Sequence, residues 1–203
     1  MELMATIKSL SPMGVVDLVL TDTSAMALWF VAAVLQLVAN LLLTQQEFAA
    51  NYTVQVIADF AWLLAATAHA VALRAIATGV NAYVHAGLLV GASCFVVSAF
   101  VPQPPASNAV LYWVFAGGLF FFVCATTVSQ TSPMRKVRLG AVGFLSGAGI
   151  TCINALCSLF YPAAPFATSR ALLAGACLVA GGFTWTTVVA EREMPKEQGF
   201  ANL

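Results

Sequence analysis

Six apolar stretches, each about 20 residues long, dominate the sequence, and short polar or proline-bearing segments separate them. A helix that crosses a bilayer needs about 20 mostly apolar residues, so each stretch is long enough to span a membrane. We therefore predict an all-α, polytopic membrane protein whose six transmembrane helices form a bundle. The predicted spans are Ser24–Leu43, Gln55–Leu73, Ala82–Val101, Asn108–Val128, Leu139–Tyr161 and Ala171–Ala190.

The balance of charged and apolar residues excludes most other classes of protein. Of the 203 residues, 61% are hydrophobic and only 8% are charged, whereas a soluble domain has about 25% charged residues. Eight Lys+Arg against eight Asp+Glu leave no net basic field that would bind nucleic acid. We divide the chain into a cytoplasmic or interfacial segment (1–23), a membrane domain (24–190) and a cytoplasmic tail (191–203).

The positions of prolines and cations support these spans and predict an orientation. All eight prolines fall outside the spans, as expected because proline breaks the backbone hydrogen bonding that lipid makes obligatory. With six spans, both termini lie on one side, and seven of the eight cations would lie there too; only Arg170 would lie on the other side. The positive-inside rule then places both termini on the cytoplasmic side of an integral, multi-pass membrane protein. The seven are Lys8, Arg74, Arg135, Lys136, Arg138, Arg192 and Lys196.

Aromatic residues near the span ends are typical of the belts that anchor helices at the membrane surface. We expect Trp29, Tyr83 and Trp185 toward the inner face. Toward the outer face we expect Tyr112, Trp113, Phe160, Tyr161 and Phe166. In the same outer region, Asn51-Tyr-Thr53 matches a short and frequent N-glycosylation motif, which we expect to lie in a loop.

Small residues indicate where helices approach one another closely. Gly87 and Gly91 form one GxxxG motif, and Gly143 and Gly147 form another. Such motifs drive close helix packing in lipid, either within one bundle or between subunits. The five cysteines all fall within spans without metal-ligand spacing, so we interpret them as small packing residues.

Polar groups inside the spans are the first candidates for function, because they are costly in lipid. Asp59 is the only carboxylate well within a span, and we expect it about one helical turn below the outer surface. Asn40 and Asn154 would lie at similar or slightly greater depth, so the three predict a polar outer cavity. The alternative for Asp59 is an interfacial position, where it faces lipid headgroups or caps its own helix.

Two histidines form a second candidate group. His69 near the end of the second span and His85 near the start of the third span lie on consecutive, antiparallel helices, so they should face each other at similar depth. They could line a pore, relay protons or gate by pH, since imidazole titrates near neutrality. The alternatives are two separate hydrogen-bonded histidines or a pair of ligands to haem or another pigment such as chlorophyll.

Three local patterns resemble the succinate–acetate permease (YaaH-like) family, whose fold is similar to that of the acid-gated urea channels. Ser11-Pro-Met-Gly-Val15 is similar to the end of the family's Asn-Pro-Ala-Pro-Leu-Gly-Leu signature, with Pro12 and Gly14 identical. Ala61 to His69 is similar in spacing to the family's second-helix pattern, with His69 in the place of an acid, and the tail from Glu191 is similar to the family's acidic exit. The resemblance implies a hexamer with one pore in each protomer.

We therefore expect a membrane channel or carrier for a small polar solute or a monocarboxylate, with proton coupling as an option. Its partners would be the lipid bilayer, the solute and further copies of the chain or a larger membrane complex, and we expect no nucleic acid. The chain lacks GxSxG, HExxH and paired carboxylates within a span, so we expect no enzyme and no metal. One alternative is a non-catalytic subunit of a larger membrane complex, and another is a haem- or pigment-binding protein. The candidate binding residues are Asn40, Asp59, His69, His85 and Asn154.

Overall fold

The computed structural model describes residues 22–72, 80–101, 108–132, 135–161 and 167–193. These residues form helices joined by short connections, and the described part of the chain contains no strand. All eight prolines, Phe166 and the segments 1–21 and 194–203 lie outside the described residues. The helices are α3 (Asp22–Thr44), α4 (Phe48–Ala72), α5 (Val80–Phe100), α6 (Ala109–Thr131), α7 (Arg135–Phe160) and α8 (Ala167–Glu193).

The predicted all-α fold with six membrane-spanning helices is confirmed, because all six helices are long and apolar enough to cross a bilayer. The largest difference from the predicted spans is at α4, which begins at Phe48 and not at Gln55. Helix α3 ends in a Schellman motif: the backbone N–H of Glu47 donates to the carbonyl of Leu42, and Gln46 adopts φ 62°. Because this ending is compact, α4 begins only a few residues after the end of α3. The moderately polar residues from Phe48 onward are therefore helical.

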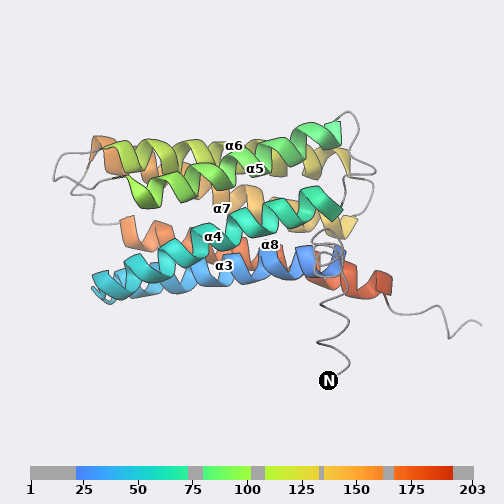
Figure 1. The fold of residues 1–203 in the computed structure, drawn as a ribbon, viewed down its shortest axis with the longest axis horizontal. Coiled ribbons are helices and arrows are strands. Elements are labelled where there is room, and N and C mark those ends of the chain that lie inside the picture. Colours follow the sequence, from blue (N-terminus) through green and yellow to red (C-terminus); the bar gives the residue numbers. More distant parts are fainter. Residues whose placement is uncertain (1–21, 73–79, 102–107, 133–134, 162–166, 194–203) are drawn as a thin grey trace, which may run out of the picture.

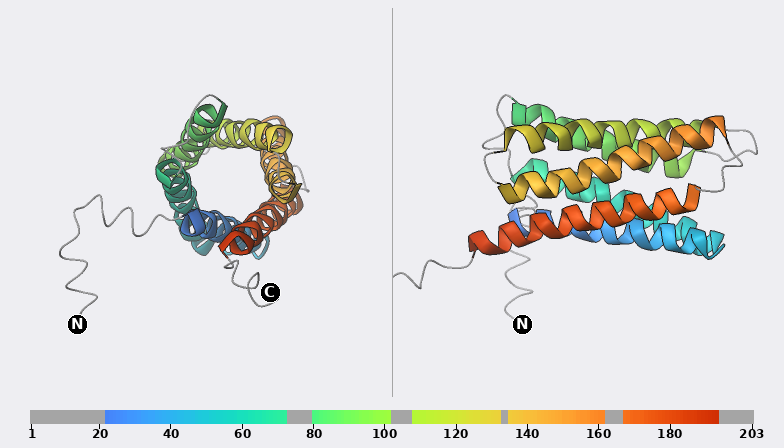
Figure 2. Two further views of the ribbon diagram at one scale, coloured as in Figure 1. Left: turned by 90° about the vertical axis from the view of Figure 1, so that its right-hand side faces the viewer. Right: turned by 180° about the vertical axis from the view of Figure 1, so that it is seen from behind.

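Figure 1 shows the six helices running side by side along one axis, and their contacts form a closed ring in chain order. Each helix packs against the helix before it and the helix after it, and α8 returns to pack against α3. Viewed along the helix axes, the ribbons surround a central axis that no further helix occupies (Figure 2). Side chains alone therefore decide whether the centre of the ring is filled or open. Because orientation in a membrane is not fixed by the fold, we name the two ends of the ring the Asn40 end and the His69 end.

The glycine motifs act inside this ring. A Cβ atom at Gly143 would lie 2.7 Å from Cα of Gly181 on α8, and a Cβ at Gly91 would lie 2.7 Å from the ring of Phe121 on α6. Only glycine allows such close approach of neighbouring helices. The sequence left open whether these motifs pack helices within one bundle or between subunits. These contacts match packing within one bundle.

One expectation about aromatic residues is wrong. Trp29 is 1% exposed and lies in the core, so it is not part of an interfacial belt. Trp185 is half-buried; its indole N–H donates to the carbonyl of Val137, and its ring stacks on Phe144. Hydropathy identifies a span but not the rotation of the helix, and Trp29 happens to face the axis of the ring. The other belt residues within the described chain are exposed: Tyr83, Tyr112, Trp113, Phe160 and Tyr161.

Candidate functional site: a polar cavity inside the helix ring

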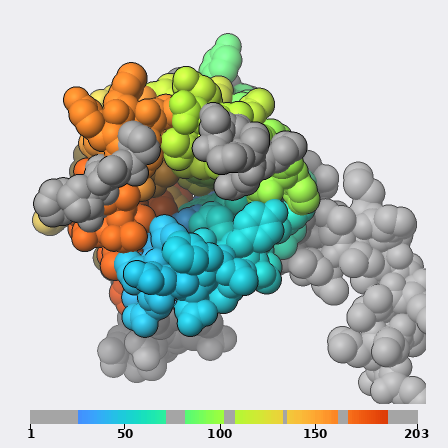
Figure 3. Space-filling view, turned by 90° about the vertical axis from the view of Figure 1, so that its left-hand side faces the viewer, coloured from blue at the N-terminus to red at the C-terminus, as the bar shows by residue number. Residues whose placement is uncertain are grey.

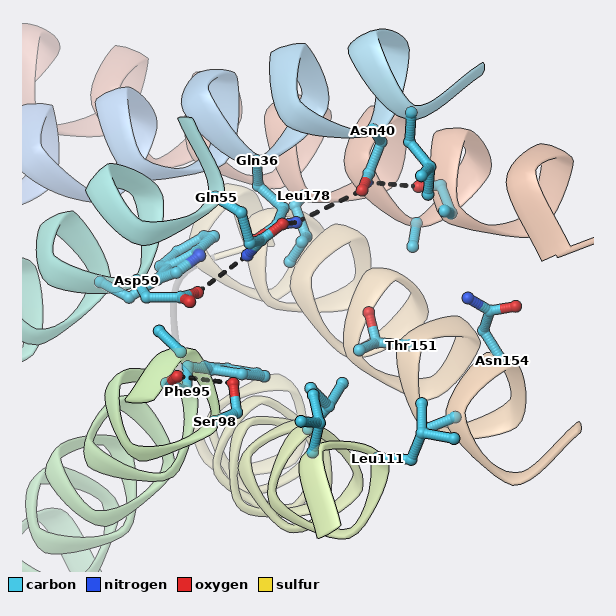
Figure 4. A pocket seen from close by; sticks show the side chains of 18 of the residues that line it. Gln36, Asn40, Gln55, Asp59, Phe95, Ser98, Leu111, Thr151, Asn154 and Leu178 are labelled. Atoms are coloured by element: carbon cyan, nitrogen blue, oxygen red, sulfur yellow. Dashed lines mark hydrogen bonds between the residues drawn. The ribbon is translucent and has the colours of Figure 1, made fainter. Parts of the chain in front are cut away.

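The ring encloses a cavity of about 260 Å³ in its half nearer the Asn40 end. Seen from this end, the molecular surface is hollowed at its centre, between the ends of α3 and α4 and those of α7 and α8 (Figure 3). Helices α3, α4, α5 and α7 contribute polar side chains to its lining, α6 and α8 contribute apolar ones, and the close-up shows side chains converging on the cavity (Figure 4). The polar lining residues are Gln36, Asn40, Tyr52, Gln55, Asp59, Ser98, Thr151 and Asn154.

Hydrogen-bonded amides connect α3 to α4 along one wall of this cavity. Gln36 and Gln55 form a reciprocal pair, with Nε2 to Oε1 distances of 2.8 and 3.0 Å. Nε2 of Gln55 also donates to Oδ1 of Asp59 at 2.9 Å, and Nε2 of Gln36 makes a longer contact of 3.4 Å with Oδ1 of Asn40. The result is a continuous series of amide and carboxyl groups from Asn40 near the mouth to Asp59 in the interior.

Asp59 lies deeper than the sequence indicated. It is the twelfth of the 24 residues in the span Phe48–Val71, which places it near the middle and about 16 Å from the start of the helix. The expected position one turn below the surface is wrong because α4 begins seven residues earlier than predicted. Asp59 is 2% exposed and its carboxyl group points into the cavity, so it neither faces headgroups nor caps its helix (Figure 4).

The two asparagines lie where the cavity approaches the Asn40 end. Asn40 donates from Nδ2 to the backbone carbonyl of Ala171 at 2.8 Å, which ties α3 to α8 where the ring closes. Across the cavity, Oδ1 of Asn154 accepts a hydrogen bond from Nε of Arg170 at 3.3 Å, and Nη2 of Arg170 is buried without a partner. The expectation that Asn40, Asp59 and Asn154 border one polar cavity is therefore confirmed.

A layer of aromatic rings closes the cavity toward the His69 end. Trp29, Trp62, Phe121 and Phe144 are buried, and their ring centroids lie 5.5 to 6.1 Å apart in tilted or edge-to-face contacts. Trp62 and Phe121 also line the cavity, so they form its floor. Beyond the floor, the described residues border an apolar space of about 10 Å³, which is close to the smallest volume that holds one water molecule.

The two histidines meet beyond this layer. Their ring centroids are 4.9 Å apart at 89°, and His69 also contacts Trp29 edge to face. The prediction that His69 and His85 face each other is thus confirmed, but they do not line the polar cavity. Nδ1 of each ring is buried without a hydrogen-bond partner.

The geometry of this histidine pair does not fit a haem. Two histidines that bind one haem iron point their nitrogens at it from opposite faces of the porphyrin, about 2 Å away on each side. Rings that touch edge to face leave no room for a porphyrin between them. The histidine pair as it stands is therefore not a site for a haem held by two histidines.

Asn51 also differs from its expected position. It lies within α4 and not in a loop, and its Nδ2 donates to the backbone carbonyl of Ala39 at 2.7 Å. Glycosylation would have to break this hydrogen bond and unwind the helix start. The five cysteines are free, and Cys94, Cys124 and Cys152 are buried, as expected for packing residues.

Sequence reasoning missed the two glutamines that connect the site. Gln36 and Asn40 are four residues apart on α3, and Gln55 and Asp59 are four apart on α4. Residues four apart lie on the same face of a helix, so two polar pairs of this spacing on an antiparallel hairpin would have predicted one shared polar face. Ser98 and Thr151 carried no such signal, because their hydroxyl groups donate to carbonyls of their own helices.

The fold and site together define an integral, multi-pass membrane protein with a polar cavity inside its helix ring. No family model, no curated protein and no solved structure matches this chain. The resemblance to the succinate–acetate permease family therefore stays a prediction, and function has to be argued from the site itself.

Proposed function

We propose that this protein is a membrane channel or carrier for a small polar solute, which passes along the axis of the helix ring. The cavity carries this proposal: it is enclosed by transmembrane helices, is about 260 Å³ in volume, and has amide and carboxyl groups at membrane depth. Polar groups at this depth are costly unless they are paired or line a path for solute. The Gln36–Gln55–Asp59 series replaces hydrogen bonds that a solute loses when it leaves water.

The aromatic layer gives the proposed path a closed gate. A solute in the cavity meets Trp62 and Phe121, and the space that Trp29, Phe121 and Phe144 border beyond them is too small for anything larger than a water molecule. Passage therefore needs the rings to move apart, as in pores that are gated by a hydrophobic constriction. The same barrier suits a carrier that opens to one side at a time.

Solute flux into proteoliposomes tests the proposal. Purified protein should admit at least one of urea, glycerol, methylammonium and acetate faster than protein-free vesicles do. Thr151 lines the cavity, so Thr151→Trp should fill it and abolish the protein-dependent flux. Leu173 on α8 is 55% exposed on the outside of the ring, so Leu173→Trp is the matched control and should transport normally.

Two outcomes would contradict passage through the cavity. One is a wild-type flux equal to that of protein-free vesicles for all four solutes. The other is a normal flux through the Thr151→Trp variant, which would place any path outside the ring. Both variants must first elute from size exclusion as the wild type does.

The sequence also predicted a non-catalytic subunit of a larger complex as an alternative. Part of its motivation was the abundance of small-residue faces, and the structure uses Gly91 and Gly143 for contacts inside one protomer. Native mass analysis after gentle extraction distinguishes the two proposals, since a lone homo-oligomer with no partner protein argues against the subunit.

A further inference from the structure

Asp59 presents a carboxyl group that has no cationic partner among the described residues. It is 2% exposed, and the only interaction that the described structure gives its carboxyl group is the hydrogen bond from Gln55. The described cations lie elsewhere: Arg135, Lys136 and Arg138 begin α7 at the His69 end, and Arg170 is bound to Asn154. Burying a carboxylate without an opposite charge costs free energy. A ligand that brings a positive charge would therefore offset this cost when it binds.

The surroundings of Asp59 suit an organic cation better than a bare metal ion. Trp62, Phe95 and Phe121 line the same cavity, and their rings pack edge to face with centroids 5.3 to 5.5 Å apart. Phe95 lies across the cavity from Asp59 (Figure 4). Aromatic faces attract ammonium groups, which retain apolar methyl or methylene surface that rings can cover. A metal ion would need several further oxygen ligands, and the described residues hold no group of three His, Cys, Asp or Glu side chains that could bind one.

We infer that the floor of the cavity binds a small ammonium cation, with the Asp59 carboxylate as its counter-ion and the rings of Trp62, Phe95 and Phe121 against its apolar surface. This inference rests on the proposed function and specifies its substrate class as a primary or methylated amine in its charged form. A monocarboxylate, which the family resemblance implies, would carry the same sign of charge as Asp59. Arg170 is the one described cation near the mouth, and it could attract a monocarboxylate. Competition by acetate in a methylammonium binding assay therefore distinguishes a cation site from an anion site.

Binding and flux must be measured separately to test this. Equilibrium binding of radiolabelled methylammonium to the purified full-length protein in detergent should be saturable, and tetramethylammonium should compete while acetate and urea should not. Asp59→Asn keeps the shape and the hydrogen-bonding capacity but removes the charge, and it should weaken methylammonium binding about tenfold or more. Glu47→Gln is the matched control, because Glu47 is an exposed acid at the start of the same hairpin arm, and it should bind as the wild type does.

A second variant keeps the inference testable if Asp59→Asn fails to fold. Phe95→Leu preserves apolar volume and leaves Asp59 intact, and it should weaken binding about two- to fivefold through loss of the aromatic face. In proteoliposomes the wild type should carry methylammonium faster than urea or acetate, and Asp59→Asn should remove this preference.

The outcomes separate this inference from the function on which it rests. Saturable flux of urea or acetate with no methylammonium binding would overturn the cation site and leave a solute path in place. Methylammonium binding without flux of any solute would support the site and overturn the path. Wild-type methylammonium affinity in both Asp59→Asn and Phe95→Leu would overturn the assignment to this cavity.

Discussion

The two halves of the helix ring differ in what fills the space between the helices. In the half nearer the Asn40 end, amide, hydroxyl and carboxyl groups border an open cavity of about 260 Å³. In the other half, Trp29, Trp62, Phe121 and Phe144 fill the axis, and the two histidines lie beyond them. The same ring of helices therefore supports an open half and a packed half, and the difference comes from the side chains that face the axis.

This contrast assigns different roles to the halves. In the packed half, glycines and aromatic rings are in close contact, and the rings close the cavity. The open half contributes polar contacts between helices, such as Gln36 with Gln55 and Asn40 with Ala171, and borders the cavity. Substitutions in the packed half should therefore mainly lower stability, and those in the open half should mainly change binding.

The largest effect is expected for Trp29→Ala in the aromatic layer. Trp29 is 1% exposed and contacts three other rings of the layer, so truncation should cost about 3–5 kcal/mol of unfolding free energy. Unfolding by SDS in mixed micelles measures this. Trp113→Ala is the control, since Trp113 is 40% exposed on the outside of the ring, and its loss should be much smaller. Equal losses would mean that the layer is not the stabilising half.

The next effect concerns the backbone contact between α7 and α8. Gly143→Ala would put a methyl group 2.7 Å from Cα of Gly181, and backbone cannot move aside as a side chain can. We expect a loss of about 1–3 kcal/mol in the same assay. Gly149→Ala is the matched control on the same helix, because its nearest neighbour is the ring of Phe122 at 3.4 Å. If Gly149→Ala proved the more destabilising of the two, this packing of α7 on α8 would be contradicted.

A smaller effect is expected from the amide pair of the open half. Gln36→Leu or Gln55→Leu leaves the partner amide without its reciprocal hydrogen bonds, and each should cost about 1–2 kcal/mol. The double variant should cost less than the sum of the single ones, because no stranded amide of the pair remains. Strict additivity in this double-mutant cycle would show that the two glutamines do not interact.

The smallest effect is expected for the histidine pair. Nδ1 of His69 makes no hydrogen bond, so His69→Phe keeps an aromatic ring against Trp29 and should change stability by less than about 1.5 kcal/mol. SDS unfolding measures the stability, and methylammonium flux in proteoliposomes shows whether gating depends on the imidazole. A loss as large as that of Trp29→Ala would show that His69 makes a polar interaction absent from this structure.

The sequence predicted the number of helices well because length and hydropathy are local properties. It predicted the start of α4 poorly, since a Schellman ending at Gln46 and Glu47 has no hydropathy signature. The candidate site was partly predictable: Asn40, Asp59 and Asn154 share a cavity as expected, while the depth of Asp59 depended on where α4 begins. The glutamines carry no ionisable group, so only the four-residue spacing of the two polar pairs on α3 and α4 indicates the face that they share.

Local sequence by itself determined that this chain forms apolar helices of membrane-spanning length and that a single carboxylate lies well within a span. It also placed the histidines opposite each other, because consecutive antiparallel helices match residues in depth. Only the tertiary structure decided which face of each helix turns toward the axis. That rotation depends on close contacts between residues far apart in the chain, such as those of Gly143 with Gly181. It places Trp29 in the buried aromatic layer and turns the carboxyl group of Asp59 into the cavity.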